Sequence, residues 1–108
     1  MAYNETIAKR LDELIKGKKG FTKKDMFGGV GYLFNGNKCV GVHKDELIIR
    51  YDPKMTEEVN KNKNVRMFDI TGRPMRGWSL VSAEELKGPA LNKWFDLSFS
   101  FAKSLPKK

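Results

Sequence analysis

The sequence predicts a single α+β domain, in which a five-stranded antiparallel sheet carries helices packed on one face, in the order α-βββ-α-ββ-α. An amphipathic helical pattern opens the chain, and short apolar runs separated by tight turns follow it. A strongly apolar helical pattern closes the chain. The length of 108 residues fits one domain, 1–108, which can bury a modest core without disulfides.

The first helix is expected over residues 4–16. Asn4 is a favourable N-cap, and apolar residues then recur every three or four positions with charges opposite them. Gly17 ends the pattern. The lysine-rich segment that follows, KGKKGFTKK at 16–24, is interpreted as a connection rather than as part of the sheet.

Three adjacent strands are expected next, because two turn signals separate three apolar runs. Asn35-Gly36-Asn37 is a strong hairpin signal, and Lys44-Asp45 marks a second turn. Connections this short allow only antiparallel pairing. The expected strands are VGYLF at 30–34, KCVGVH at 38–43 and ELIIRY at 46–51.

The second half of the chain is expected to add a short surface helix at 53–61 and two more strands, at 65–70 and 77–81. Pro89 restarts a helix that runs to about Ser104. The apolar residues of that helix cover an arc too wide for one contact surface. It is therefore expected to touch two surfaces, either the sheet and the first helix or the sheet and a second subunit.

The positive charge is concentrated in two segments. The formal net charge is +8, and five lysines lie in 16–24 and three in 103–108, which is expected to be a flexible basic tail. The remaining residues hold 13 basic and 13 acidic side chains. One interpretation is nucleic-acid contact through both segments, and the other is solvated lysines that maintain solubility. The candidate nucleic-acid contacts in the first segment are Lys16, Lys18, Lys19, Lys23 and Lys24.

Catalytic and metal-binding residues are not expected. Cys39 and His43 are the single cysteine and the single histidine, and on a regular strand they would share a face with too few partners for a metal. Gly28, Gly29 and Gly31 lack the spacing of a phosphate loop. Gly29 and Gly31, with Gly41 on the neighbouring strand, favour a smooth patch under a closely packed helix. No enzyme activity, cofactor or metal is therefore expected. One cysteine and the absence of a signal-peptide or membrane-spanning pattern predict a cytoplasmic protein.

Two further groups of residues are candidate contact sites. Arg73 and Arg76 lie close to Trp78, and this group is the candidate contact for an anion or an acidic partner. Trp94, Phe99 and Phe101 on the last helix form a candidate self-association face.

Several motifs together resemble the N-terminal domain of the TfoX/Sxy family. The resemblance rests on Met26-Phe27-Gly28-Gly29, the strand at 31–34, the strand at 47–52, and Gly72-Arg73-Pro74-Met75 with Gly77-Trp78. The final helix with Trp94 and Phe101-Ala102 also contributes. This resemblance implies an α+β fold with a five-stranded antiparallel sheet. Full-length members are bacterial regulators of competence for DNA uptake, and the family implies no catalytic residues.

Three hypotheses for function follow. The first is a non-enzymatic regulatory module that works through a protein partner, with a homodimer as one form of that partnership. The second is sequence-tolerant, weak nucleic-acid binding through the two lysine-rich segments. The third is a small-molecule site at the glycine-smoothed face of the sheet beside Arg73 and Arg76.

Overall fold

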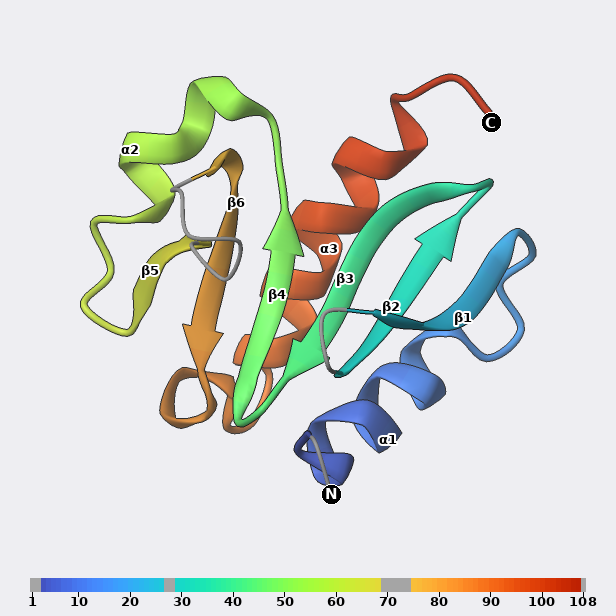
Figure 1. Cartoon of the computed structure of the whole chain (residues 1–108), viewed down its shortest axis with the longest axis horizontal. Helices are drawn as coiled ribbons and strands as arrows, with labels where there is room; N and C mark the ends of the chain where they lie inside the picture. The colour runs from blue at the N-terminus through green and yellow to red at the C-terminus, as the bar shows by residue number, and fades with distance from the viewer. Residues whose placement is uncertain (1–2, 27–28, 69–74, 108) are drawn as a thin grey trace.

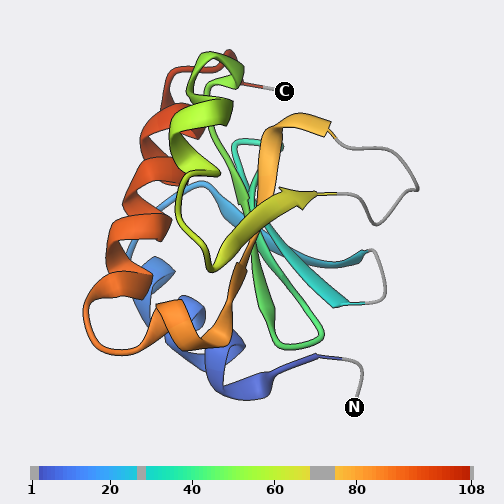
Figure 2. The same ribbon diagram turned by 90° about the vertical axis from the view of Figure 1, so that its left-hand side faces the viewer.

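The computed structural model describes residues 3–26, 29–68 and 75–107. In this part of the chain a six-stranded antiparallel sheet carries three α-helices on one of its faces (Figures 1 and 2). The strands lie in the order β1-β2-β3-β4-β6-β5. They are β1 (Phe21–Met26), β2 (Gly29–Phe34), β3 (Asn37–His43), β4 (Glu46–Arg50), β5 (Val65–Phe68) and β6 (Met75–Ser82).

The sheet therefore has one strand more than the sequence predicts, and the expected order α-βββ-α-ββ-α is wrong at this point. The additional strand is β1, which forms an edge of the sheet and pairs in full register with β2, from Phe21 opposite Phe34 to Met26 opposite Gly29. Its sequence, FTKKDM, is polar and shows no apolar alternation. Lysines are nevertheless common on edge strands, because they discourage pairing with another chain.

The two predicted turns are confirmed. Asn35 and Gly36 both have positive φ, 51° and 84°, as a two-residue type I′ hairpin requires. We refer to these two residues as the β2–β3 turn. Lys44, with a φ of 54°, begins the turn between β3 and β4. These turns fix β2, β3 and β4 as neighbouring antiparallel strands.

A β-bulge interrupts the pairing of β2 with β3. Tyr32 lies opposite Val40 and Leu33 opposite Lys38, so Cys39 is an extra residue without a partner on β2. A bulge shifts the alternation of side chains along its strand. Cys39 consequently belongs to the same buried cluster as Val40.

The main core lies between the sheet and the helices α1 (Glu5–Ile15) and α3 (Ala90–Lys103). Cross-strand neighbours such as Val40 and Ile49 supply its sheet side, and Leu11 and Phe95, both almost fully buried, supply its helical side. A smaller cluster of Ile48, Phe68 and Leu80, with Trp78 at its border, lies on the other face of the sheet. The helices therefore cover one face, as predicted.

The glycine pair Gly31 and Gly41 does not lie under a helix, contrary to the sequence-based interpretation. The two residues are directly opposite each other, and Gly41 is next to Ile48 on the face away from the helices. A Cβ on Gly41 would come within 2.8 Å of the carbonyl oxygen of Val30. Glycine is required here by close approach of the neighbouring backbone.

Two further helical features complete the fold. The predicted helix at 53–61 is shorter and divided into a 3₁₀ turn, η1 (Pro53–Met55), and α2 (Thr56–Val59). A second 3₁₀ turn, η2 (Ala83–Leu86), precedes α3, which ends close to the predicted position. Within the described residues, no helix has the length and apolar character needed to cross a membrane.

Candidate functional site

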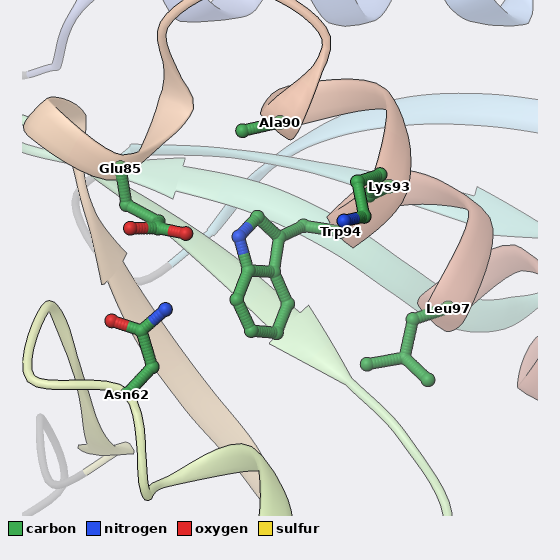
Figure 3. A pocket seen from close by; sticks show the side chains of 6 residues that line it. All are labelled: Asn62, Glu85, Ala90, Lys93, Trp94 and Leu97. Carbon is green, nitrogen blue, oxygen red and sulfur yellow. The ribbon is translucent and has the colours of Figure 1, made fainter.

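A groove of about 320 Å³ lies beside α3 and is the first candidate site (Figure 3). Three separate segments line it: α3, η2, and the loop 60–64 that connects α2 to β5. The lining residues are Asn62, Glu85, Ala90, Lys93, Trp94 and Leu97. No single run of sequence indicates this groove, because its walls are about 30 residues apart along the chain.

The side chain of Trp94 lies at the centre of this groove. Figure 3 shows its indole between Glu85, Asn62 and Leu97, with the ring nitrogen toward Glu85. Trp94 is half-buried and packs against the main core with part of its ring. Its indole N–H donates to no other described residue, and no buried polar atom of the described chain lacks a partner, so the N–H is open to solvent.

Hydrogen bonds hold the opposite wall of the groove in place. The backbone N–H of Asn64 donates to Oδ1 of Asn62 at 2.8 Å, which fixes the loop. The side-chain amide of Asn64 donates to Oε1 of Glu85 at 3.2 Å, which ties the loop to η2. Lys93 is exposed at the rim. The groove thus has the indole N–H of Trp94 as a hydrogen-bond donor at its base, and the charges of Glu85 and Lys93 at its border.

The three residues predicted to form one self-association face have different surroundings in the structure. Phe99 belongs to an aromatic cluster with Phe21, Phe34 and Phe95, with ring centroids 5.1 to 5.6 Å from its own. Phe101 instead lies near Arg50, and Trp94 lines the groove. The wide apolar arc of α3 is explained by two different surroundings. The sheet packs against the side with Phe99, whereas η2 and the loop 60–64 border the side with Trp94.

Of the predicted anion-contact residues, the structure places Arg76 and Trp78 and gives them different partners. Arg73 lies outside the described residues, and Arg76 is exposed, with a guanidinium N–H donating to the Pro53 carbonyl at 3.4 Å. Trp78 packs on Phe68, with ring centroids 5.8 Å apart, and its ring lies 5.2 Å from the guanidinium carbon of Arg50.

Arg50 is placed between two aromatic rings. Its guanidinium carbon is 5.4 Å from the centroid of Phe101 as well as 5.2 Å from that of Trp78, within the range of cation–π attraction. One guanidinium N–H donates to the Lys38 carbonyl at 3.3 Å. Burial lowers the pKa of Arg50 from its ordinary value. Among the described residues no carboxylate pairs with it. The sequence-based prediction chose the arginines that are close to Trp78 along the chain. It therefore missed Arg50, which contacts Trp78 only in the folded structure.

The five candidate lysines of 16–24 are all exposed, but they are not equivalent. Lys18 donates to the Leu14 carbonyl at the end of α1, at 2.6 Å. Lys23 forms an ion pair with Asp12 at 3.2 Å and lies over the ring of Tyr32. Lys16, Lys19 and Lys24 make no such contact with the described residues.

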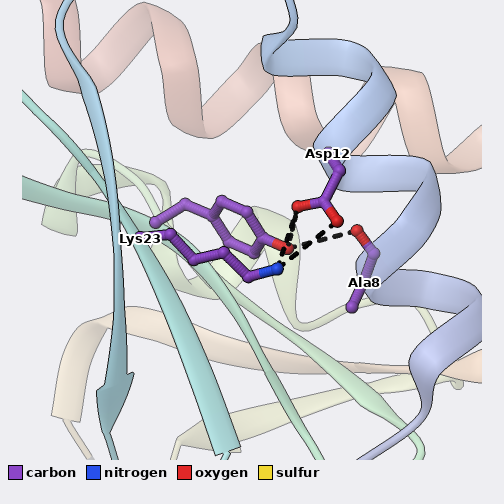
Figure 4. A network of polar contacts seen from close by, with 4 residues as sticks. Ala8, Asp12 and Lys23 are labelled. Carbon is purple, nitrogen blue, oxygen red and sulfur yellow. Dashed lines mark hydrogen bonds and ion pairs between the residues drawn. The ribbon is translucent and has the colours of Figure 1, made fainter.

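A polar network beneath Lys23 fastens α1 to the sheet (Figure 4). The hydroxyl of the fully buried Tyr32 lies 2.8 Å from Oδ1 of Asp12 and 3.1 Å from the Ala8 carbonyl, and it donates to one of them at a time. Burial raises the pKa of Tyr32, and its hydrogen bond to Asp12 and the charge of that carboxylate raise it further. Through its ion pair with Asp12, Lys23 thus contributes to the attachment of α1 to the sheet.

Cys39 and His43 are not brought together. The bulge directs Cys39 into the helix-covered core, whereas His43, which follows Val42 in regular alternation, lies on the opposite face. Burial raises the pKa of the Cys39 thiol to about 12, and the charge of Arg50 offsets only part of this effect. In the described segments no group of three or more His, Cys, Asp or Glu side chains could hold a metal ion.

Fold and site together define a small α+β domain with an aromatic-based groove beside its last helix. A protein-family model, the TfoX N-terminal domain, matches residues 13–102 and so covers most of the chain. The chain therefore belongs to the TfoX N-terminal domain family. No curated protein and no solved structure is significantly similar to it.

Proposed function

We propose that this chain is a non-enzymatic regulatory module that binds a protein partner through the groove at Trp94. Membership of the TfoX N-terminal domain family supports a regulatory role related to competence. The proposal includes no cofactor or metal. It places the protein in the cytoplasm, where the single thiol, Cys39, stays reduced.

The observation that carries this proposal is the exposure of the Trp94 indole at the base of a pre-formed groove. Tryptophan is enriched among the residues that dominate binding energy in protein interfaces, because one side chain offers a large apolar area and a hydrogen-bond donor. The groove is also held open by the hydrogen bonds of Asn64, so little ordering is needed when a partner binds.

The chemistry of the groove defines what the partner must offer. An apolar side chain fits against Trp94 and Leu97, and a carbonyl oxygen beside it can accept from the indole N–H. The formal charge of +8 opposes pairing of two copies of this chain. We therefore expect a segment of a different protein in the groove, and a homodimer is the alternative that the experiment distinguishes.

The test compares Trp94→Ala with Asn92→Ala as baits in a native extract at high salt. Asn92 is exposed on the same helix and does not line the groove. A protein captured by the wild-type chain and by Asn92→Ala, but not by Trp94→Ala, is then purified and titrated directly. We expect its affinity to fall at least tenfold for Trp94→Ala, since loss of a central aromatic residue typically costs about 2 kcal/mol or more.

Two results contradict the proposal. One is equal affinity of the purified partner for both variants. The other is sedimentation of the wild-type chain as a dimer at micromolar concentration that becomes a monomer in Trp94→Ala, which assigns the groove to self-association.

A further inference from the structure

The two lysine-rich segments, which are far apart in the sequence, lie on the same edge of the folded molecule. The carbonyl oxygen of Gly20 accepts from the backbone N–H of Asn35 at 2.8 Å, which attaches the first segment to the β2–β3 turn. The side-chain amide of Asn37, the first residue of β3, donates to the carbonyl of Pro106 at 2.9 Å, which attaches the C-terminal segment directly beside the same turn. Figure 1 shows the C-terminus, this turn and the start of β1 at one side of the sheet.

Packing beneath the surface joins the two segments as well. The Nζ of Lys103 lies 4.6 Å from the ring centroid of Phe99, and Phe99 contacts Phe21 at the start of β1 and Phe34 at the end of β2. The segments therefore share one aromatic base. We use the name basic edge for the surface formed by Lys16, Lys18, Lys19, Lys103 and Lys107, all of which are exposed.

We infer that the basic edge is one composite binding site for the phosphate backbone of a nucleic-acid duplex. Its cations are all lysines, which act as mobile point charges and suit a regularly charged phosphate backbone. The aromatic rings below it pack against one another and are only partly exposed, so they do not form a stacking platform for single-stranded bases.

An acidic protein is a less suitable occupant of this surface. Lysine is depleted in protein–protein interfaces, whose centres are apolar or aromatic. The exposed residues between the lysines of the basic edge are small or polar, namely Gly17, Gly20, Ser104 and Pro106. The two proposed contacts are therefore separate: the groove at Trp94 for a protein, and the basic edge for a polyanionic backbone.

The experiment measures binding of a 20-base-pair DNA duplex by fluorescence anisotropy at increasing salt, beginning near 50 mM. A loop variant carries Lys16→Gln, Lys18→Gln and Lys19→Gln, and a tail variant carries Lys103→Gln and Lys107→Gln. A control variant removes three exposed lysines elsewhere, with Lys54→Gln, Lys63→Gln and Lys87→Gln. Lys54 lies in η1, Lys63 precedes the opposite edge strand β5, and Lys87 follows η2.

We expect one duplex site per chain, with a Kd of about 10⁻⁴ to 10⁻⁶ M near physiological salt, as for ordinary non-specific binding. Each phosphate contact contributes about −0.9 to the slope of log K against log salt, so the loop and tail variants should each reduce the steepness by roughly 2. Each should also weaken binding roughly tenfold or more, whereas the control variant should bind nearly as the wild-type chain does. Trp94→Ala should leave duplex binding unchanged, which keeps this test independent of the protein contact.

Several outcomes overturn the inference. A Kd weaker than about 1 mM at low salt removes the site, because it is poorer than non-specific binding. An equal loss in the control variant shows that net charge alone is responsible. An effect of only one of the two segments shows that the site is not composite. Equal affinity for polyglutamate, for vesicles that contain phosphatidylserine or for the single strand assigns the edge to another polyanion.

Discussion

The two flanks of α3 carry similar aromatic residues but have different surroundings. We call the side with Phe95 and Phe99 the packed flank, because Phe21 and Phe34 of β1 and β2 lie against it. We call the side with Trp94 and Leu97 the open flank, because these two residues line the groove. On a helix, Phe99 lies about 140° around the axis from Trp94.

This difference shows that the wide apolar arc of α3 can serve two purposes, namely packing on one flank and binding on the other. On the packed flank the chain supplies its own partners from the edge strand β1. On the open flank the facing segment is the polar loop 60–64, which borders the ring of Trp94 without covering it. The same kind of side chain therefore contributes to stability on one side and is available for binding on the other.

The largest expected effect compares the two flanks directly. Phe95→Ala removes a side chain that is almost fully buried and should lower the free energy of unfolding by about 3–5 kcal/mol. Trp94→Ala removes a half-buried side chain at an existing groove, and the expected cost is about 1–2 kcal/mol. Urea unfolding of both variants measures the difference. Equal costs would remove the distinction between the packed and the open flank.

A second prediction tests whether the interior beneath α3 is closed to water, using Cys39. Its pKa is raised to about 12 when folded, whereas an unfolded cysteine ionises near 9. The folded chain therefore prefers the neutral thiol, and this stability is complete below about pH 9 and is lost as the pH rises toward 12. The limiting slope is about 1.4 kcal/mol per pH unit. Melting temperatures from pH 8 to 11 should fall more steeply for the wild-type chain than for Cys39→Ala.

The third prediction concerns the attachment of α1 on the side of β1 and β2. Tyr32→Phe removes a buried hydroxyl that bonds to Asp12 or to the Ala8 carbonyl, and should cost about 1–2 kcal/mol. Asp12→Asn and the double variant complete a mutant cycle in urea. Fully additive effects would show that the hydroxyl and the carboxylate do not interact. Asp12→Asn also removes the ion pair with Lys23, but this loss occurs in both the single and the double variant and therefore cancels in the coupling energy.

The smallest expected effect is at Arg50, whose guanidinium contacts Phe101 on α3. Arg50→Lys keeps the charge but loses the planar group between Trp78 and Phe101, with an expected cost of about 0.5–1 kcal/mol. Arg76→Lys is the matched control, because Arg76 is exposed. Thermal melting measures both variants, and the melting temperature of Arg76→Lys should barely differ from that of the wild-type chain. A larger loss at Arg76 than at Arg50 would contradict the importance of the aromatic contacts.

Local signals in the sequence predict most of the fold. Asn4 caps α1 through the N–H of Ile7, Asn35-Gly36 makes the hairpin, and α3 begins directly after Pro89. In each case the determining interaction lies within a few residues of the signal. Short apolar runs between turn signals likewise identify β2 and β4, because both strands lie inside the sheet and are buried on both faces.

The features that the sequence does not predict depend on contacts between distant segments. β1 has lysines where alternation would require apolar residues, and it is a strand because β2 offers it a pairing edge. The bulge at Cys39 reverses the expected relation to His43, since one unpaired residue shifts the alternation. The groove depends on the loop at Asn62 meeting α3. The basic edge depends on hydrogen bonds that attach one lysine-rich segment to the β2–β3 turn and the other to the adjoining first residue of β3.

The ends of the helices at the basic edge have an electrostatic consequence. α1 leads into the first lysine-rich segment and α3 into the second, so two helix C-termini, each with a partial negative charge, lie beside these cations. Lys18 already donates to the Leu14 carbonyl at the last turn of α1. A phosphate chain must compete with the helix ends for the same ammonium groups. The number of lysines at the basic edge therefore overstates the electrostatic attraction for a phosphate backbone. The two helix C-termini limit the affinity for the duplex.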